Sequence, residues 1–123
     1  MAIEYEIEDG VLILRVAAGG YAYLRDALRA ARNDTSARPL MPLLMDLRGE
    51  PPSVRYEDVR WRVEILAEMR QQFGPRWAFV TGTGPVRTGV GRMFAVFSEI
   101  EGLDVGLFAD KATALRWLGE AGA

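Results

Sequence analysis

The chain has 123 residues, of which 50% are hydrophobic and 26% are charged, a balance typical of one folded domain spanning residues 1–123. Its net charge of −2 gives no overall field that would attract nucleic acid. The chain contains no Cys and no His, which excludes disulfides, thiolate nucleophiles, Ser-His-Asp triads and the usual zinc sites. We therefore expect neither a metal site nor a cofactor.

The sequence also carries no sign of a membrane segment. No run approaches the roughly 20 consecutive apolar residues that a transmembrane helix needs. The first six residues, Met1-Ala2-Ile3-Glu4-Tyr5-Glu6, are acidic and alternate from Ile3 onward, which is the opposite of a signal peptide. The expectation is a cytoplasmic protein.

The chain opens with a predicted β-hairpin. Between residues 3 and 8 apolar and acidic side chains alternate, a pattern typical of a strand with one face in water. Asp9-Gly10 is a two-residue turn signal, and a buried strand resumes at Val11. The first two strands should be antiparallel, with the first on or near an edge of the sheet.

Strand-then-helix units follow. The predicted strands, with the second arm of the hairpin, are Val11–Ala17, Leu43–Leu47, Trp77–Thr81 and Val105–Phe108. The predicted helices run from about Tyr21 to Arg32, from Pro51-Pro52-Ser53 to about Phe73, from about Gly89 to Ile100, and onward from a cap at Asp110. Because parallel neighbours require a crossover, this alternation predicts an α/β fold with a mixed five-stranded sheet, an N-terminal antiparallel hairpin followed by strand–helix repeats. Ligands of such sheets bind at the carboxyl ends of the strands.

The glycine-rich loop Gly82–Arg92 is the predicted ligand site. It links the end of a strand to the start of a helix, where free N–H groups and the helix dipole favour an anion. The residues predicted to hold such an anion are Arg48, Thr81, Thr83, Arg87, Thr88 and Arg92. The loop matches neither the Walker pattern, because Val90-Gly91 follows Gly89, nor the dinucleotide pattern, because Arg87 replaces a glycine. The alternative is a plain connection whose glycines relieve strain in the turn.

Carboxylates also follow the third predicted strand. Asp46 and Glu50, with Arg48 between them, leave its carboxyl end, where carboxylates can bind a cation or transfer protons. No His accompanies them, so an ion pair within the loop is the competing interpretation.

Two large apolar residues, Trp61 and Ile65, lie four positions apart on the second predicted helix. They stand on the side opposite its predicted core face, which comprises Tyr56, Val59, Val63, Leu66 and Phe73. Exposed apolar pairs are often contact surfaces, and a homodimer contact is the preferred version. Burial under a neighbouring element of the same chain is the alternative.

With these segments placed, the chain resembles the SpoIIAA-like domains of the STAS superfamily, in particular the small bacterial proteins described as STAS/SEC14-like. The resemblance rests on the opening hairpin and on the segments Leu43-Leu44-Met45-Asp46-Leu47-Arg48, Gly91-Arg92-Met93-Phe94, Phe108-Ala109-Asp110 and Ala114-Leu115-Arg116-Trp117-Leu118. It implies a non-enzymatic module, and some members of the wider group are thought to bind lipids or nucleotides.

The resemblance also implies a place for a phosphoswitch. Sporulation antagonists of this fold are switched by phosphorylation of a Ser in an Asp-Ser-Ser-Gly-like start of the second helix. The corresponding stretch here places Ser53 at the helix start, without the Asp-Ser dipeptide and without the following Gly. A plain helix cap is therefore the preferred role for Ser53.

Three functions follow from the sequence. The preferred one is a cytoplasmic interaction or regulatory module that acts through protein–protein contacts, with a homodimer formed through Trp61 and Ile65. The alternative is a small anionic ligand, a nucleotide or lipid headgroup, held by the Gly82–Arg92 loop. The third is a carboxylate-based enzyme centred on Asp46 and Glu50.

Overall fold

The computed structural model describes residues 2–51 and 55–120. In chain order its elements are β1 (Ile3–Glu8), β2 (Val11–Ala17), the 3-10 helix η1 (Gly20–Tyr23), α1 (Leu24–Arg32), β3 (Leu43–Gly49), α2 (Tyr56–Ala67), β4 (Arg76–Val80), α3 (Pro85–Ile100), β5 (Asp104–Phe108) and α4 (Lys111–Glu120). The predicted strand-then-helix alternation is confirmed.

The five strands form one sheet in the order β1-β2-β3-β4-β5. β1 and β2 are antiparallel, and the remaining neighbours are parallel, as the sequence predicts. The hairpin turn uses Asp9 and Gly10, with φ angles of 51° and 77°. Positive φ at both central residues is the geometry that matches the twist of a two-residue hairpin, and it explains the Asp-Gly pair.

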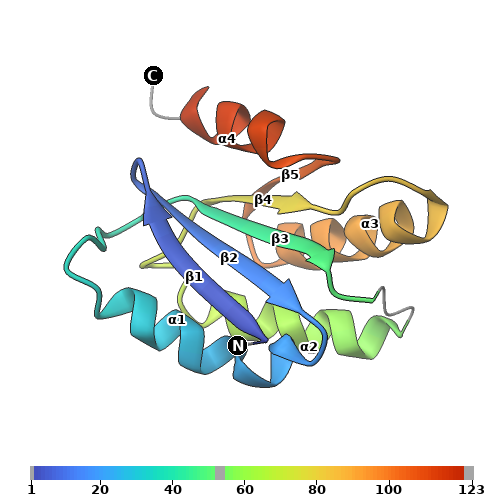
Figure 1. Ribbon diagram of the computed structural model, residues 1–123, viewed down its shortest axis with the longest axis horizontal. Coiled ribbons are helices and arrows are strands. Elements are labelled where there is room, and N and C mark those ends of the chain that lie inside the picture. Colours follow the sequence, from blue (N-terminus) through green and yellow to red (C-terminus); the bar gives the residue numbers. More distant parts are fainter. Residues whose placement is uncertain (1, 52–54, 121–123) are drawn as a thin grey trace.

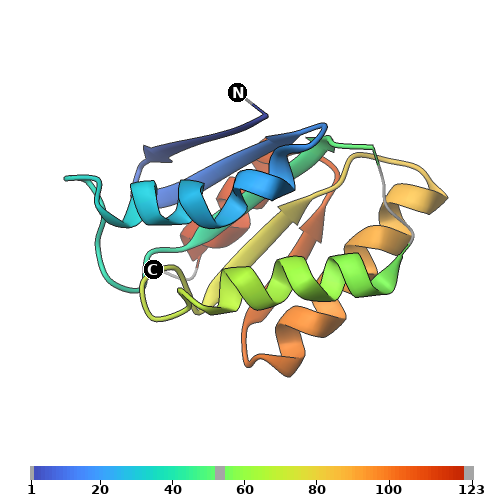
Figure 2. The same cartoon turned by 90° about the horizontal axis from the view of Figure 1, so that it is seen from below.

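The helices cover the two faces of the sheet unequally (Figure 1). On one face, α1, α2 and α3 pack on the larger core, which includes Leu14, Met45 and Phe79. On the other face α4 alone covers a smaller core that includes Ile13, Leu44 and Val80. Seen from the three-helix side, α2 lies between α1 and α3 (Figure 2).

Several helix boundaries differ from the prediction. The first helix begins as η1 and is α-helical only from Leu24, and the second starts at Tyr56 and not at Pro51-Pro52-Ser53. The second helix ends at Ala67 and not near Phe73, because residues 68–73 continue as tight turns whose last residue, Phe73, is still buried. The third helix starts at Pro85, four residues earlier than predicted. Pro85 needs no hydrogen-bond acceptor for its nitrogen and therefore suits the first helical position after Gly84. Ser53 and Pro52 lie outside the described residues.

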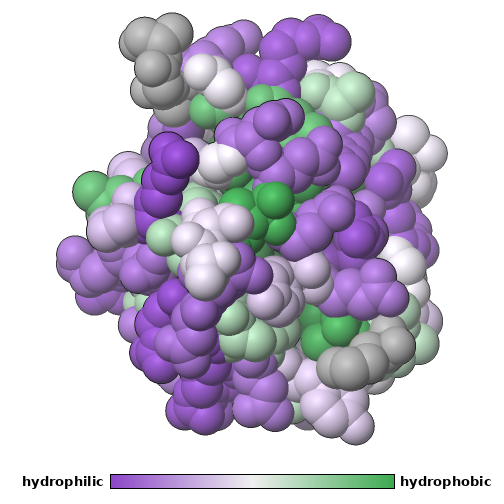
Figure 3. Space-filling view, turned by 60° about the vertical axis from the view of Figure 1, so that its left-hand side comes forward, coloured by the Kyte–Doolittle hydropathy of each residue, from purple (hydrophilic) through white to green (hydrophobic). Residues whose placement is uncertain are grey.

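The surface is mostly polar on the side that carries the β1–β2 turn and the loop after α1. In Figure 3 hydrophilic residues cover most of this side, and hydrophobic ones form small, separate patches. No helix among residues 2–51 and 55–120 is both long and apolar enough to cross a membrane.

Candidate functional site

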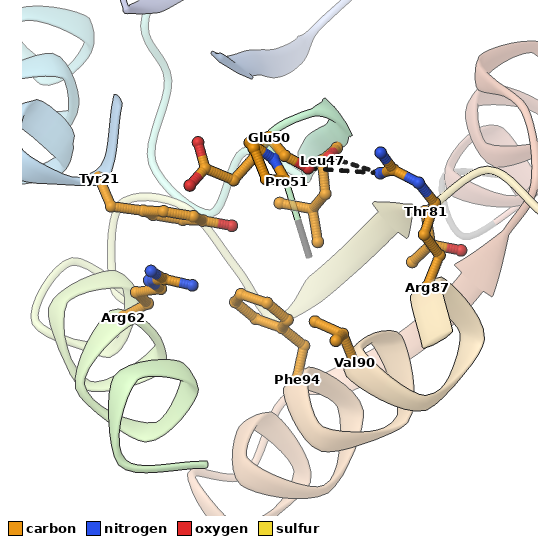
Figure 4. Close-up of a pocket in the computed structure, with 9 residues that line it drawn as sticks. All are labelled: Tyr21, Leu47, Glu50, Pro51, Arg62, Thr81, Arg87, Val90 and Phe94. Carbon is orange, nitrogen blue, oxygen red and sulfur yellow. Dashed lines mark hydrogen bonds between the residues drawn. The ribbon is translucent and has the colours of Figure 1, made fainter. Parts of the chain in front are cut away.

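A small pocket lies where β3 and β4 end, on the face of the sheet that the three helices cover (Figure 4). Leu47, Pro51, Val90 and Phe94 form its apolar wall, and its polar lining comprises Tyr21, Glu50, Arg62, Thr81 and Arg87. Its cavity volume is about 20 Å³, which is room for one or two water-sized groups. The pocket therefore occupies the predicted edge of the sheet, but it is too small for a whole nucleotide.

Two polar groups at this pocket have no hydrogen-bond partner within the described part of the chain. Tyr21 is 6% exposed, and its hydroxyl points into the cavity. Burial raises the pKa of this phenol. The Oε2 atom of Glu50 is buried without a partner among the described residues. Unpaired buried polar atoms are rare in folded proteins, and among the described residues Glu50 Oε2 is such an atom.

The two arginines of the pocket are already engaged. The guanidinium of Arg62 lies over the Tyr21 ring, 3.7 Å from its centroid. Arg87 donates from Nη1 to the carbonyl oxygens of Leu47 and Glu50, at 3.3 and 3.4 Å (Figure 4). Arg87 thus links the first turn of α3 to the segment that follows β3.

On the α4 side of the same strand end, Asp46 forms an ion pair with Arg48. Arg48 donates from Nε to Oδ1 at 3.0 Å and from Nη2 to Oδ2 at 2.8 Å. Burial opposes ionisation of Asp46, but the hydrogen bonds and charge of Arg48, with the charge of Arg15, outweigh it and hold the pKa of this carboxyl below its ordinary value. The ion pair that the sequence left as the alternative to a reactive carboxylate thus forms, but within β3 and not in the loop after it.

The structure brings together only some of the residues predicted to hold an anion. Arg48 and Arg87 flank Gly82, since a Cβ placed there would lie 3.5 Å from Arg48 Cγ and 3.6 Å from Arg87 Cδ. Thr81 is buried beside them. The guanidinium of Arg48 bonds to Asp46 and that of Arg87 to two backbone carbonyls, so the two groups do not converge on one position for a phosphate.

The remaining predicted loop residues lie apart from this group. Thr83 is exposed, and the hydroxyl of Thr88 donates to the carbonyl of Gly84 at 2.8 Å. Because α3 already begins at Pro85, Arg92 stands on the helix about 140° around and about 7.5 Å along from Arg87. Most of the segment predicted as one loop, from Pro85 onward, is therefore helix, and the anion site stays a prediction.

The predicted apolar pair on α2 is wrong in one member. Trp61 is 48% exposed, but Ile65 is 3% exposed and belongs to the larger core. Tyr56, predicted to face the core, is instead 51% exposed. The burial of Ile65 follows from the position of α2 between α1 and α3, which buries a wider arc of this helix than a single core stripe (Figure 2), whereas Tyr56 is the first residue of the helix.

Exposed apolar side chains nevertheless occur on both α2 and α3. Tyr56 and Trp61 of α2 and Val96 and Ile100 of α3 are among the seven large hydrophobic residues that are exposed in the described structure. The ring of Tyr56 stacks on Phe97 at a centroid distance of 6.0 Å. We name Tyr56, Trp61, Val96, Phe97 and Ile100 the α2–α3 surface.

Sequence reasoning placed Tyr21 at the start of the first helix but did not predict that its hydroxyl faces a pocket, and it did not single out Arg62. The sequence shows an aromatic residue, Tyr21, at the start of one helix and an arginine, Arg62, on the next. Their spacing does not indicate that the guanidinium of Arg62 lies over the Tyr21 ring.

Comparison with known proteins yields a match in structure only. No family model matches the sequence, and neither does any curated protein. The crystal structure of an uncharacterised protein of the DUF3478 family from Shewanella loihica, described as having a SpoIIAA-like fold, is similar to this chain. The TM-score is 0.62, with 21% sequence identity over 95% of this chain and 92% of that one. This chain therefore has a SpoIIAA-like fold.

Proposed function

We propose that the protein is a non-enzymatic interaction module that acts through protein–protein contacts. The observation that carries the proposal is the α2–α3 surface, where four exposed large apolar side chains occur on two adjacent helices. Contiguous exposed apolar residues with a polar rim are characteristic of interaction sites. The surface replaces the pair of Trp61 and Ile65 as the predicted contact.

The interactions of the charged side chains at the carboxyl ends of the strands favour a binding role over a catalytic one. The ionised Asp46 is held by Arg48, and Nη1 of Arg87 donates to two backbone carbonyls, so neither group is poised as an acid, a base or an electrophile. The sequence adds no His or Cys that could take those roles.

The proposal is tested by affinity capture with immobilised protein as bait. The bait carries either the native sequence, the double substitution Tyr56→Ser with Ile100→Glu, or the control Val86→Ser. Val86 is 53% exposed and lies at the other end of α3, so the control removes a similar apolar side chain away from the surface. We expect proteins retained by the native bait and by the control to be lost with the double variant. Equal retention by all three baits would refute the assignment of this surface.

A further inference from the structure

The α2–α3 surface includes a groove with an exposed side chain at its rim. The groove lies between the two helices, has a volume of about 270 Å³, and is lined by Arg60, Val63, Glu64, Phe97, Ile100 and Glu101. Ile100 is 74% exposed, the largest exposed fraction among the large hydrophobic residues of the described structure. Ile100 is thus both a projecting side chain and, with Val63 and Phe97, part of the apolar lining of the groove.

The charged residues that line this groove are Arg60, Glu64 and Glu101. Arg60 pairs with Glu64 at 3.1 Å, and Arg70, outside the lining, pairs with Glu101 at 3.3 Å. Three of these four side chains are about half exposed, and Glu101 is 33% exposed, so all of them remain open to a second partner. A strongly acidic or basic partner would leave part of this rim facing like charge, and an anionic lipid surface would face both carboxylates.

We propose that the occupant of the groove is a second copy of this chain, related by a twofold axis, with Ile100 of each protomer inserted between α2 and α3 of the other. The inference rests on the proposed function and names its partner. An isologous contact requires a patch that complements itself, and a patch that holds both the projection and the groove, with side chains of both charges, meets that requirement. The net charge of the whole chain is only −2, so electrostatic repulsion between two copies is small.

The position of the surface permits such pairing. From the three-helix side, no other described element lies over the outer faces of α2 and α3 (Figure 2). Two helices of 12 and 16 residues present a limited area, so we expect a weak, concentration-dependent dimer and not an obligate one.

Sedimentation velocity over a wide range of protein concentration tests the proposal. We expect the native chain to pass from monomer to dimer, and Ile100→Glu to raise the dimer dissociation constant by about tenfold or more. Because Ile100 is exposed, this variant should retain the native melting temperature. The control Val86→Ser should dimerise like the native chain.

A covalent readout is available because the chain has no cysteine. In oxidising buffer, Ile100→Cys and Val96→Cys place a single thiol on the proposed contact, and Val86→Cys places one outside it. We expect disulfide-linked dimers to form at least about tenfold faster with the first two variants than with the third. Equal rates in all three would mean random collision and would overturn the contact.

The other outcomes separate the two proposals. A native chain that stays monomeric throughout, while affinity capture of other proteins still depends on Tyr56 and Ile100, would overturn the second copy and leave the interaction module standing. A dimer unaffected by Ile100→Glu would overturn this groove as the contact. Flotation of the native chain with phosphatidylglycerol vesicles, lost with Ile100→Glu, would assign the surface to a membrane and overturn both proposals.

Discussion

Replacing Ile65 by Ala tests whether this side chain is buried, as in the structure, or exposed as a surface contact, as the sequence predicted. At 3% exposure Ile65 packs in the larger core, and truncation of a buried Ile leaves a cavity whose cost is about 3 kcal/mol. For 123 residues the unfolding entropy is about 0.26 kcal/mol/K, so the melting temperature should fall by about 12 °C. The milder Ile65→Val should lower it by about 4 °C.

Differential scanning calorimetry at low protein concentration, where the proposed dimer would dissociate, measures both shifts. Ile100→Ala is the matched control, since it makes the same chemical change at a side chain that is 74% exposed. We expect it to change stability by no more than about 0.5 kcal/mol, or about 2 °C. Ile65→Ala melting within 2 °C of the native chain would refute the burial of Ile65 between the helices.

Three further predictions concern the sheet edge. Asp46→Asn should destabilise the fold by about 1–2 kcal/mol near neutral pH. The folded pKa of Asp46 lies below its unfolded value, so the stabilisation by its ionised carboxylate is fully present above about pH 4 and is lost as pH falls further. Denaturation curves of the native chain and the variant should therefore converge in acid. Tyr21→Phe should leave the melting temperature unchanged or slightly raised, because the hydroxyl has no protein partner to lose; a loss above about 1 kcal/mol would show that it is bonded. Gly91→Ala should destabilise by about 1–3 kcal/mol in chemical denaturation, since its Cβ would lie 2.7 Å from Thr81 Cγ2, and native stability would contradict this close approach.

The fold was predictable because local signals agreed with one another. The alternation of residues 3–8, the Asp9-Gly10 turn and the apolar run from Leu43 to Leu47 each specify a strand or a turn from a few neighbouring residues. Their order along the chain then restricts the connections, since parallel neighbours need crossovers. These are properties that a sequence carries within a short window.

The predicted contact surface failed where the answer depends on neighbours far away in sequence. Periodicity gives the angle of Ile65 around α2, but whether that angle faces water depends on α1, which comes more than 20 residues earlier. The same holds for Arg87, whose partners are the carbonyls of Leu47 and Glu50. A glycine-rich loop with arginines looks the same in sequence whether its guanidinium groups await an anion or bind the backbone.

The unequal covering of the sheet has a consequence for the chain as it is synthesised. Each strand pairs with its predecessor, so the sheet can be laid down in the order of translation, and the three-helix face is closed once α3 has followed β4. The opposite face, with Ile13, Leu44 and Val80, stays uncovered until α4 emerges. A nascent chain halted before Lys111 would therefore expose a strip of β-sheet hydrophobic side chains, the kind of surface that chaperones bind and that drives aggregation.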